Sequence, residues 1–155
     1  MISTKEKTAI RVLGPDEVSK AFPIAKAFHK DTDLLVDELD GDYWRDMWSD
    51  MVSRGIGVIV VLEADGEVVG ALCGLCAPHL LAPVLCFTEA MWYIKKEWRG
   101  YGTRMLRFAE EIAVAKGCTL MNMVHLVDSR AVRMSHFYKR SGYTPSEAHY
   151  LKEIG

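Results

Sequence analysis

Hydrophobic and polar residues follow different spacings along the chain, and each spacing predicts an element. Runs rich in β-branched and aromatic residues predict strands at residues 8–13, 58–63, 67–76, 84–94 and 119–127. Asp65-Gly66 lies between the second and third runs and is a strong hairpin signal. The last run, 119–127, is almost continuously apolar, as expected for a central strand with both faces covered. One or two final strands are expected within residues 143–151, interrupted at Pro145.

Two helices are predicted between the first and second strands. The first begins at Pro15 and should be kinked or broken at Pro23, because proline lacks a backbone donor and crowds the preceding turn. The second follows Asp42, which is well placed to cap it, and ends at Gly55. Core packing best explains its apolar stripe, and a place in a substrate pocket is the lesser alternative for Tyr43 or Trp44; the stripe consists of Trp44, Met47, Trp48 and Met51.

A strand, a glycine pair and a helix meet in the stretch 92–117. Gly100 and Gly102 allow the backbone to turn and to come close to a ligand, and an amphipathic helix runs from there to Gly117. The first turn of a helix leaves N–H groups unpaired and carries the positive end of the helix dipole. The stretch therefore predicts a site for a phosphate-bearing cofactor. An ordinary strand-to-helix turn with solvated arginines would give the same pattern.

The residues at this turn resemble the acyl-CoA pyrophosphate loop of the GNAT superfamily, the GCN5-related N-acetyltransferases. The family motif is Arg/Gln-x-x-Gly-x-Gly/Ala after a strand and before a helix; the matching stretch here is Glu97-Trp98-Arg99-Gly100-Tyr101-Gly102-Thr103-Arg104. Arg99 and Gly102 match the first and fourth positions, whereas Arg104 stands where Gly or Ala is usual. The resemblance implies a single α/β domain over residues 1–155. In that fold a mixed sheet is splayed between its fourth and fifth strands, with helices on both faces.

The resemblance also implies a cosubstrate, acetyl-CoA, with no metal, and a transfer of acetyl to a primary amine of a small molecule or peptide. The implied cofactor contacts are Tyr93, Ile94, Arg99, Gly100, Tyr101, Gly102, Thr103 and Arg104. The family's second cofactor motif resembles residues 136–143, where Tyr138 would protonate the sulfur of CoA. A core tyrosine with its hydroxyl at the rim would look the same. Seven residues earlier the family often has Asn, and this chain has Ala131.

Glu89 is the candidate general base, because it is the only carboxylate in the strand before Ile94; a solvent-facing position is the alternative. The last helix, capped by Asp128 or Ser129, would carry Tyr138. A second functional class stays open on sequence alone. It is a non-catalytic module of the same fold that binds CoA or a protein partner.

The formal net charge of −2 argues against general nucleic-acid binding. Acidic residues crowd the segment between Asp31 and Asp42 without a Lys or Arg among them, which favours a cationic acceptor amine. A solvated acidic loop would give the same composition. The chain has no apolar run approaching membrane-spanning length and no signal core, so no membrane partner and a cytoplasmic location are expected. A homodimer is one expected assembly, since dimers are common in the superfamily.

Metal binding is not expected, although Cys73 and Cys76 stand three residues apart and His79 follows. No second Cys-x-x-Cys or His-x-x-x-His completes a tetrahedral site, so the four cysteines are interpreted as buried apolar thiols. His125, within the run 119–127, is interpreted as a core histidine.

Overall fold

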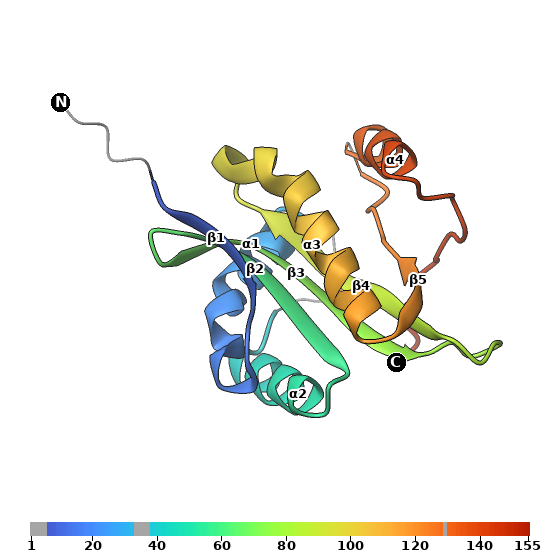
Figure 1. The fold of residues 1–155 in the computed structure, drawn as a ribbon, viewed down its shortest axis with the longest axis horizontal. Helices are drawn as coiled ribbons and strands as arrows, with labels where there is room; N and C mark the ends of the chain where they lie inside the picture. The colour runs from blue at the N-terminus through green and yellow to red at the C-terminus, as the bar shows by residue number, and fades with distance from the viewer. Residues whose placement is uncertain (1–5, 33–37, 129) are drawn as a thin grey trace.

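The computed structural model describes residues 6–32, 38–128 and 130–155 and has one five-stranded mixed sheet (Figure 1). In sheet order, which is also chain order, the strands are β1 (Thr8–Val12), β2 (Gly57–Ala64), β3 (Glu67–Pro78), β4 (Leu85–Ile94) and β5 (Cys118–Asn122). Neighbours are antiparallel from β1 to β4, whereas β4 and β5 are parallel. The predicted hairpin is confirmed. Asp65 (φ 49°) and Gly66 (φ 85°) both take the left-handed conformation that a tight β2–β3 turn requires.

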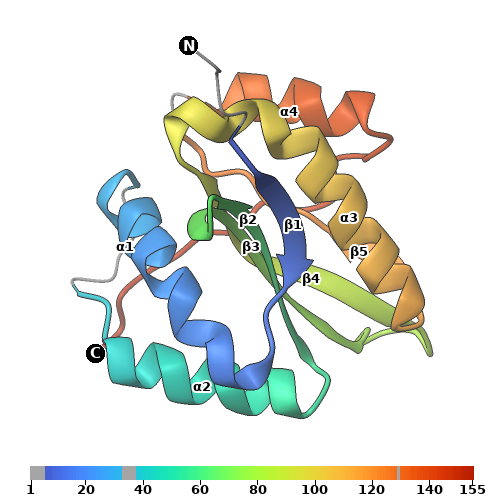
Figure 2. The same cartoon turned by 60° about the vertical axis from the view of Figure 1, so that its left-hand side comes forward.

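Helices cover both faces of the sheet (Figure 2). The helices are α1 (Phe22–Lys30), α2 (Gly41–Ser53), α3 (Gly102–Ala115) and α4 (Ala131–Arg140), with 3₁₀ helices η1 (Pro15–Ala21) and η2 (Lys96–Tyr101) before α1 and α3. Strand β2, next to the edge strand β1, is buried on both sides. Val58, Val60 and Leu62 join the core cluster that includes α3, whereas Ile59 and Val61 join the cluster of η1, α1 and α2. β2 therefore contributes to the hydrophobic core on both faces of the sheet.

A β-bulge in β4 changes which side chains point to each face of the sheet. Glu89 pairs with Gly74 and Met91 with Cys73, so one residue of β4, Ala90, has no counterpart in β3. In a regular strand, side chains four positions apart share a face. Here Phe87 packs in the α3 cluster and Met91 in the opposite cluster. After the bulge, Trp92 and Ile94 therefore pack on the α3 face, at positions that a regular strand would have placed on the opposite face.

Position 74 on β3 has room only for glycine, because the ring of Phe87 on β4 lies against it. A Cβ atom on Gly74 would lie 2.2 Å from Cζ of Phe87 and 2.8 Å from the carbonyl oxygen of Thr88. Neither contact can be relieved by a flexible side-chain end, because one partner is a buried ring and the other is backbone. The missing side chain thus lets the strand pair close up beside the bulge.

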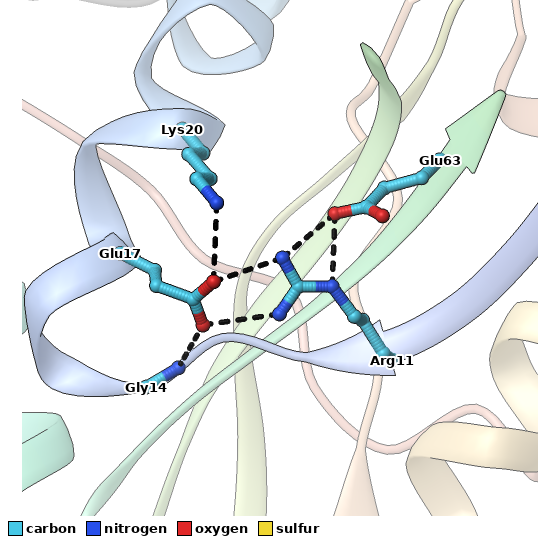
Figure 3. Close-up of polar contacts among 5 residues, drawn as sticks. All are labelled: Arg11, Gly14, Glu17, Lys20 and Glu63. Atoms are coloured by element: carbon cyan, nitrogen blue, oxygen red, sulfur yellow. Dashed lines mark hydrogen bonds and ion pairs between the residues drawn. The ribbon is translucent and has the colours of Figure 1, made fainter. Parts of the chain in front are cut away.

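A charged network ties η1 to the edge of the sheet (Figure 3). The guanidinium of Arg11 on β1 donates two hydrogen bonds to Glu17 on η1, each 3.0 Å, and lies 2.8 Å from Oε1 of Glu63 on β2. Oε2 of Glu17 also accepts the N–H of Gly14 at 3.1 Å, and Oε1 accepts a hydrogen bond from Nζ of Lys20. The hydrogen bonds from Arg11 are the main reason that the pKa of Glu17 falls to about 2. The network fixes where the chain leaves β1 and so where α1 begins.

Of the two helix starts before β2, one agrees with expectation and one does not. The predicted break at Pro23 is confirmed, because η1 ends at Ala21 and Pro23 occupies the first turn of α1, where a missing N–H costs nothing. The prediction that Asp42 caps α2 is wrong. Asp40 is the cap, since its carboxylate accepts the N–H of Tyr43 at 2.9 Å, and Asp42 lies inside the first turn.

The start of α4 is a turn rather than a side-chain cap. Asp128 accepts the N–H of Arg130 at 2.8 Å, and α4 begins at Ala131. Ser129, the other predicted cap, lies outside the described residues. The predicted end at Gly142 is confirmed by its φ of 91°.

The expectation of a central strand over residues 119–127 is wrong. The strand ends at Asn122 and forms the edge of the sheet, with Cys118 as its only buried residue. The predicted final strands within 143–151 are also wrong, because residues 143–155, all of them described, contain no strand. Apolar character cannot distinguish a strand covered on two faces from an edge strand that continues into a cavity-lining loop. That distinction depends on which segments lie beside it.

Candidate active site

A cavity opens where β4 and β5 diverge. The ladder between them ends at the pair Thr88 and Asn122, while β4 continues to Ile94 and the chain after β5 bends away. The cavity, about 430 Å³, lies between the second half of β4, the loop after β5, and α4. Across it, the ring of Trp92 on β4 contacts Phe137 and Tyr138 on α4, with centroids 5.8 Å and 6.3 Å apart. The splay between strands four and five that the resemblance implied is thus present.

Two side chains form the hydrogen bonds of the Val124 backbone, because Val124 lies beyond the end of the β4–β5 ladder. The N–H of Val124 donates to Oε2 of Glu89 at 2.7 Å, and its carbonyl accepts the hydroxyl of Tyr138 at 2.9 Å. The same Glu89 oxygen lies 3.4 Å from the Tyr138 hydroxyl. The two residues singled out as acid and base, 49 positions apart in the chain, therefore meet in the cavity wall.

The surroundings of these two groups favour their proton-bearing forms. Burial raises the pKa of Glu89 to about 7, and the hydrogen bonds from Val124 and Tyr138 only partly oppose this effect. Burial, reinforced by the nearby charge of Glu89, raises the pKa of Tyr138. Near neutral pH Glu89 can thus gain or lose a proton, whereas the Tyr138 hydroxyl keeps its own. This pairing is what general acid–base chemistry requires.

The turn into α3 differs in detail from the expectation. The 3₁₀ helix η2 runs directly into α3, and the N–H of Gly102 already donates to the carbonyl of Arg99. Gly102 has an ordinary helical conformation, with φ −55° and ψ −45°. The glycines are therefore not needed to turn the chain. A Cβ on Gly100 would meet nothing within 4 Å, and one on Gly102 would stand 3.7 Å from Trp92 at the cavity wall.

The residues around the cavity fit a ligand such as acyl-CoA. The two glycines leave open the space beside the helix start that side chains would fill, which suits close approach by a phosphate group. Four arginines line the cavity: Arg99, Arg130, Arg133 and Arg140. Beyond Thr88 the edge of β4 that faces the cavity has no strand beside it in the described chain. Its backbone groups suit an extended ligand, and the carbonyl of Ile94 already accepts from Nε of Arg99 at 3.1 Å.

The predicted site residues divide into two groups. The cavity is lined by Tyr138, Glu89, Tyr93, Ile94, Arg99 and Gly102, whereas Gly100, Tyr101, Thr103 and Arg104 are not part of its lining. Arg104 lies over the ring of Tyr101, 5.1 Å from its centroid, and the Tyr101 hydroxyl lies 3.4 Å from Oγ1 of Thr8. Thr103 lines a separate hollow between α3 and α4.

Sequence reasoning missed part of the cavity wall. His125, interpreted as a core residue, is exposed and lines the cavity, because the chain leaves the sheet before reaching it. Asp128 and Arg130 line the same wall and form an ion pair at 2.7 Å. No periodicity marks these three residues. Their position in the loop between β5 and α4, which the family motifs flank, was the only available signal.

Asp31, at the end of α1, contacts two residues that line the cavity. Its carboxylate accepts a short hydrogen bond from the hydroxyl of Tyr93, and its carbonyl lies 3.5 Å from Arg130. Of the acidic segment, Glu38 and Asp40 belong to the approach to α2, and the expected contributions of Asp33 and Asp37 lie outside the described residues.

Other chemistries find little support in the described residues. No three His, Cys, Asp or Glu side chains among them come together as a metal site would require. All four cysteines are free and buried, as the core interpretation expected. Within the same residues, every helix is too short or too polar to cross a lipid bilayer.

The chain belongs to the GNAT acetyltransferases. The family model described as "Acetyltransferase (GNAT) family" matches residues 22–143, which include the cavity and both motifs. A comparison with curated protein sequences found no match.

Solved structures of N-acetyltransferases share the fold. A ribosomal-protein-alanine N-acetyltransferase from Brucella melitensis biovar Abortus 2308 is similar with TM-score 0.75 and 12% identity, over 96% of this chain and 99% of that chain. An aminoglycoside N-acetyltransferase in complex with CoA gives 0.75 and 11%, over 99% of each chain. Glucosamine-6-phosphate N-acetyltransferase from Arabidopsis thaliana gives 0.71 and 17%, over 97% of this chain and all of that one. Such low identities establish the fold alone.

The raised pKa of Glu89 predicts a pH-dependent stability. Between the ordinary value of 4.5 and about 7, the unfolded chain releases this proton and the folded chain keeps it, so stability falls as pH rises through that window. Glu89→Gln removes the titration while its amide oxygen can still accept the N–H of Val124. Thermal unfolding should show the variant more stable than the parent at pH 8, by about 1 to 3 kcal/mol, and no such gain at pH 4. Glu111→Gln, an exposed carboxylate outside the cavity, is the control. An equal gain at both pH values would contradict the shift.

Proposed function

We propose that this protein is an N-acetyltransferase that moves an acetyl group from acetyl-CoA directly to a primary amine of a small-molecule or peptide acceptor. Membership of the GNAT family supports the acetyl transfer. The observation that carries the proposal for this chain is the meeting of Glu89 and Tyr138 at Val124, inside the cavity between the diverging strands. Acetyl-CoA supplies an activated acyl thioester. The protein has to hold it, free the amine of its protons and protonate the departing sulfur.

The start of α3 is the proposed cofactor end of the cavity. Arg99 and the open space beside Gly100 and Gly102 would receive the pyrophosphate. The proposed donors are backbone N–H groups within residues 100–104 other than that of Gly102, which is bonded to Arg99. The free edge of β4 at Tyr93 and Ile94 would pair with the pantetheine arm. This assignment places the thioester toward Glu89 and Tyr138.

Tyr138 is the proposed general acid and Glu89 the proposed base. The hydroxyl of Tyr138 keeps its proton at neutral pH and can give it to the sulfur, which spares the expulsion of a bare thiolate. Glu89, with a pKa of about 7, can accept a proton from the acceptor nitrogen directly or through a water molecule. Their separation of 3.4 Å allows Glu89 to return a proton to Tyr138 after each turnover.

A non-catalytic CoA-binding module is the second candidate. The observation in its favour is that Glu89 and Tyr138 already hydrogen-bond to Val124, which a purely structural role would also explain. A screen of polyamines, aminoglycosides, amino acids and peptide N-termini separates the two. Release of CoA with any of these amines favours the enzyme. Thermal stabilisation by acetyl-CoA without CoA release favours the module.

The cofactor assignment predicts the effect of Gly102→Val. The fold has room for a Cβ at this position, 3.7 Å from Trp92, so the side chain would instead occupy space meant for the ligand. The variant should unfold near the parental temperature and bind acetyl-CoA at least about tenfold more weakly, measured by calorimetric titration. Thr103→Val places the same side chain one position along and keeps the backbone donor, so it should bind normally. Parental affinity in Gly102→Val would place the cofactor elsewhere.

The acid role predicts the effect of Tyr138→Phe. The variant should lose about a hundredfold in kcat when chemistry limits the rate, and its affinity for acetyl-CoA should change little. Tyr143→Phe is the matched control, because its ring contacts Tyr138 at 5.6 Å and it does not line the cavity. An unchanged kcat in Tyr138→Phe, with normal folding, would show that the hydroxyl serves only to hold Val124.

The acceptor is proposed to be cationic, drawn by acidic residues between Asp31 and Asp42. Among those described, only Asp31 reaches the cavity wall, through Tyr93. For an amine found in the screen, Asp31→Asn should raise KM and flatten the dependence of kcat/KM on ionic strength, because exposed charges are screened within about 8 Å at physiological salt. Asp40→Asn is the matched control. It removes the same charge at the cap of α2, where an asparagine side chain can still act as the cap. Identical salt slopes and KM values in both variants and the parent would remove the acidic segment from substrate choice.

A further inference from the structure

His125 occupies a position that neither the fold nor the proposed acid–base pair accounts for. It follows Val124 directly, so the two hydrogen bonds that fix the Val124 backbone also fix where this side chain starts. It lines the cavity and is exposed to solvent. A side chain in this position touches both the reaction space and bulk water.

The hydrogen bond of the imidazole defines which nitrogen can accept a proton. Nδ1 of His125 lies 3.2 Å from the carbonyl oxygen of Leu126. A carbonyl oxygen can only accept, so Nδ1 must carry the hydrogen of this bond. In the neutral ring Nε2 then has the free electron pair. The local backbone thus selects the tautomer in which the outer nitrogen is a base.

The reaction itself needs two proton acceptors. A protonated primary amine, R–NH₃⁺, becomes an amide N–H, so its nitrogen gives up two protons when the C–N bond forms and the C–S bond breaks. One proton ends on the sulfur of CoA, and the second must leave the site. Glu89 and Tyr138 account for the first, since Glu89 can take it from the nitrogen and replace the proton that Tyr138 gives to sulfur. This closed cycle has no route for the second.

We propose that His125 is a further catalytic residue, whose Nε2 takes from the ammonium form of the acceptor the proton that does not end on sulfur, and passes it to solvent. The proposal rests on the function proposed above. The amine is left neutral with a free electron pair, and the imidazole becomes imidazolium until water removes the proton. Histidine suits this step because an imidazole nitrogen with a free electron pair can take up a proton and release it again.

The charged and titratable groups around His125 come from several elements. Glu89 and Tyr93 face the cavity from β4, and Asp128 lies in the same loop. From α4 and its start come Arg130, Arg133 and Tyr138, and Asp31 meets Tyr93 from the end of α1. The pKa of Asp128 is lowered chiefly by its hydrogen bond from Arg130 and to a smaller extent by the charge of His125. Asp128 is therefore the carboxylate of this loop that interacts with both His125 and Arg130.

The test compares two acceptors in the parent, His125→Gln and His125→Ala. One is an alkyl amine from the screen that is protonated at pH 7, and the other is its β,β,β-trifluorinated analogue, whose amine is largely neutral there. Both variants should lose about ten- to a hundredfold in kcat/KM with the first amine and much less with the second, because the second arrives without the extra proton that His125 would remove. Added imidazole should restore part of the activity of His125→Ala. Acetyl-CoA affinity should be unchanged, and His149→Gln, in the exposed segment after α4 and outside the cavity lining, should behave as the parent.

Each outcome bears on one proposal or on both. Equal losses with the two amines, or parental activity in both variants, would overturn the role of His125 and leave the acetyltransferase intact. Loss of acetyl-CoA affinity would show instead that His125 supports the cofactor end of the cavity. A parent protein that turns over no amine at all would overturn the proposed function, and this inference with it.

Discussion

The site depends on one structural constraint: β4 and β5 pair for only four positions and then separate. Beyond that point the N–H and C=O of Val124 have no ladder partners, and backbone groups in a folded protein must find others. Glu89 and Tyr138 supply them from β4 and α4. The two side chains that bind the Val124 backbone are thus also the proposed proton-transfer groups. A substitution at either residue therefore affects both the path of the chain after β5 and the proposed acid–base pair.

The bulge in β4 makes this arrangement possible from the other side. A regular strand would send Phe87, Glu89 and Met91 to one face. The extra residue, Ala90, lets Phe87 fill the α3 side and Met91 the opposite side, with Glu89 at the change of register. Gly74 removes the side chain that would collide with Phe87 at the same place.

The cavity carries charges of both signs. Arginines from η2, α4 and the loop before α4 line it, which suits the phosphates of a nucleotide-bearing cofactor. Asp128 lines it beside Arg130, and Asp31 reaches its wall through Tyr93. The proposed acceptor amine would meet carboxylates whose positions are set by these contacts before it arrives.

The sequence by itself determined what short-range physics controls. Asp65-Gly66 required a left-handed turn, Pro23 a helix boundary, and the motif around Gly100 and Gly102 indicated the family. Glu89 and Tyr138 were each candidates on that resemblance, but their meeting at Val124 was not predicted. Tertiary structure decided what depends on neighbours distant in the chain. The run 119–127 became an edge strand and a cavity-lining loop because β4 curves away from it, and this exposed His125. Asp40 rather than Asp42 caps α2, because the helix starts at Gly41, two residues earlier than a cap at Asp42 would give. Local sequence patterns determine where turns and helices form. Burial depends on which distant segments pack against each other, and therefore on the tertiary structure.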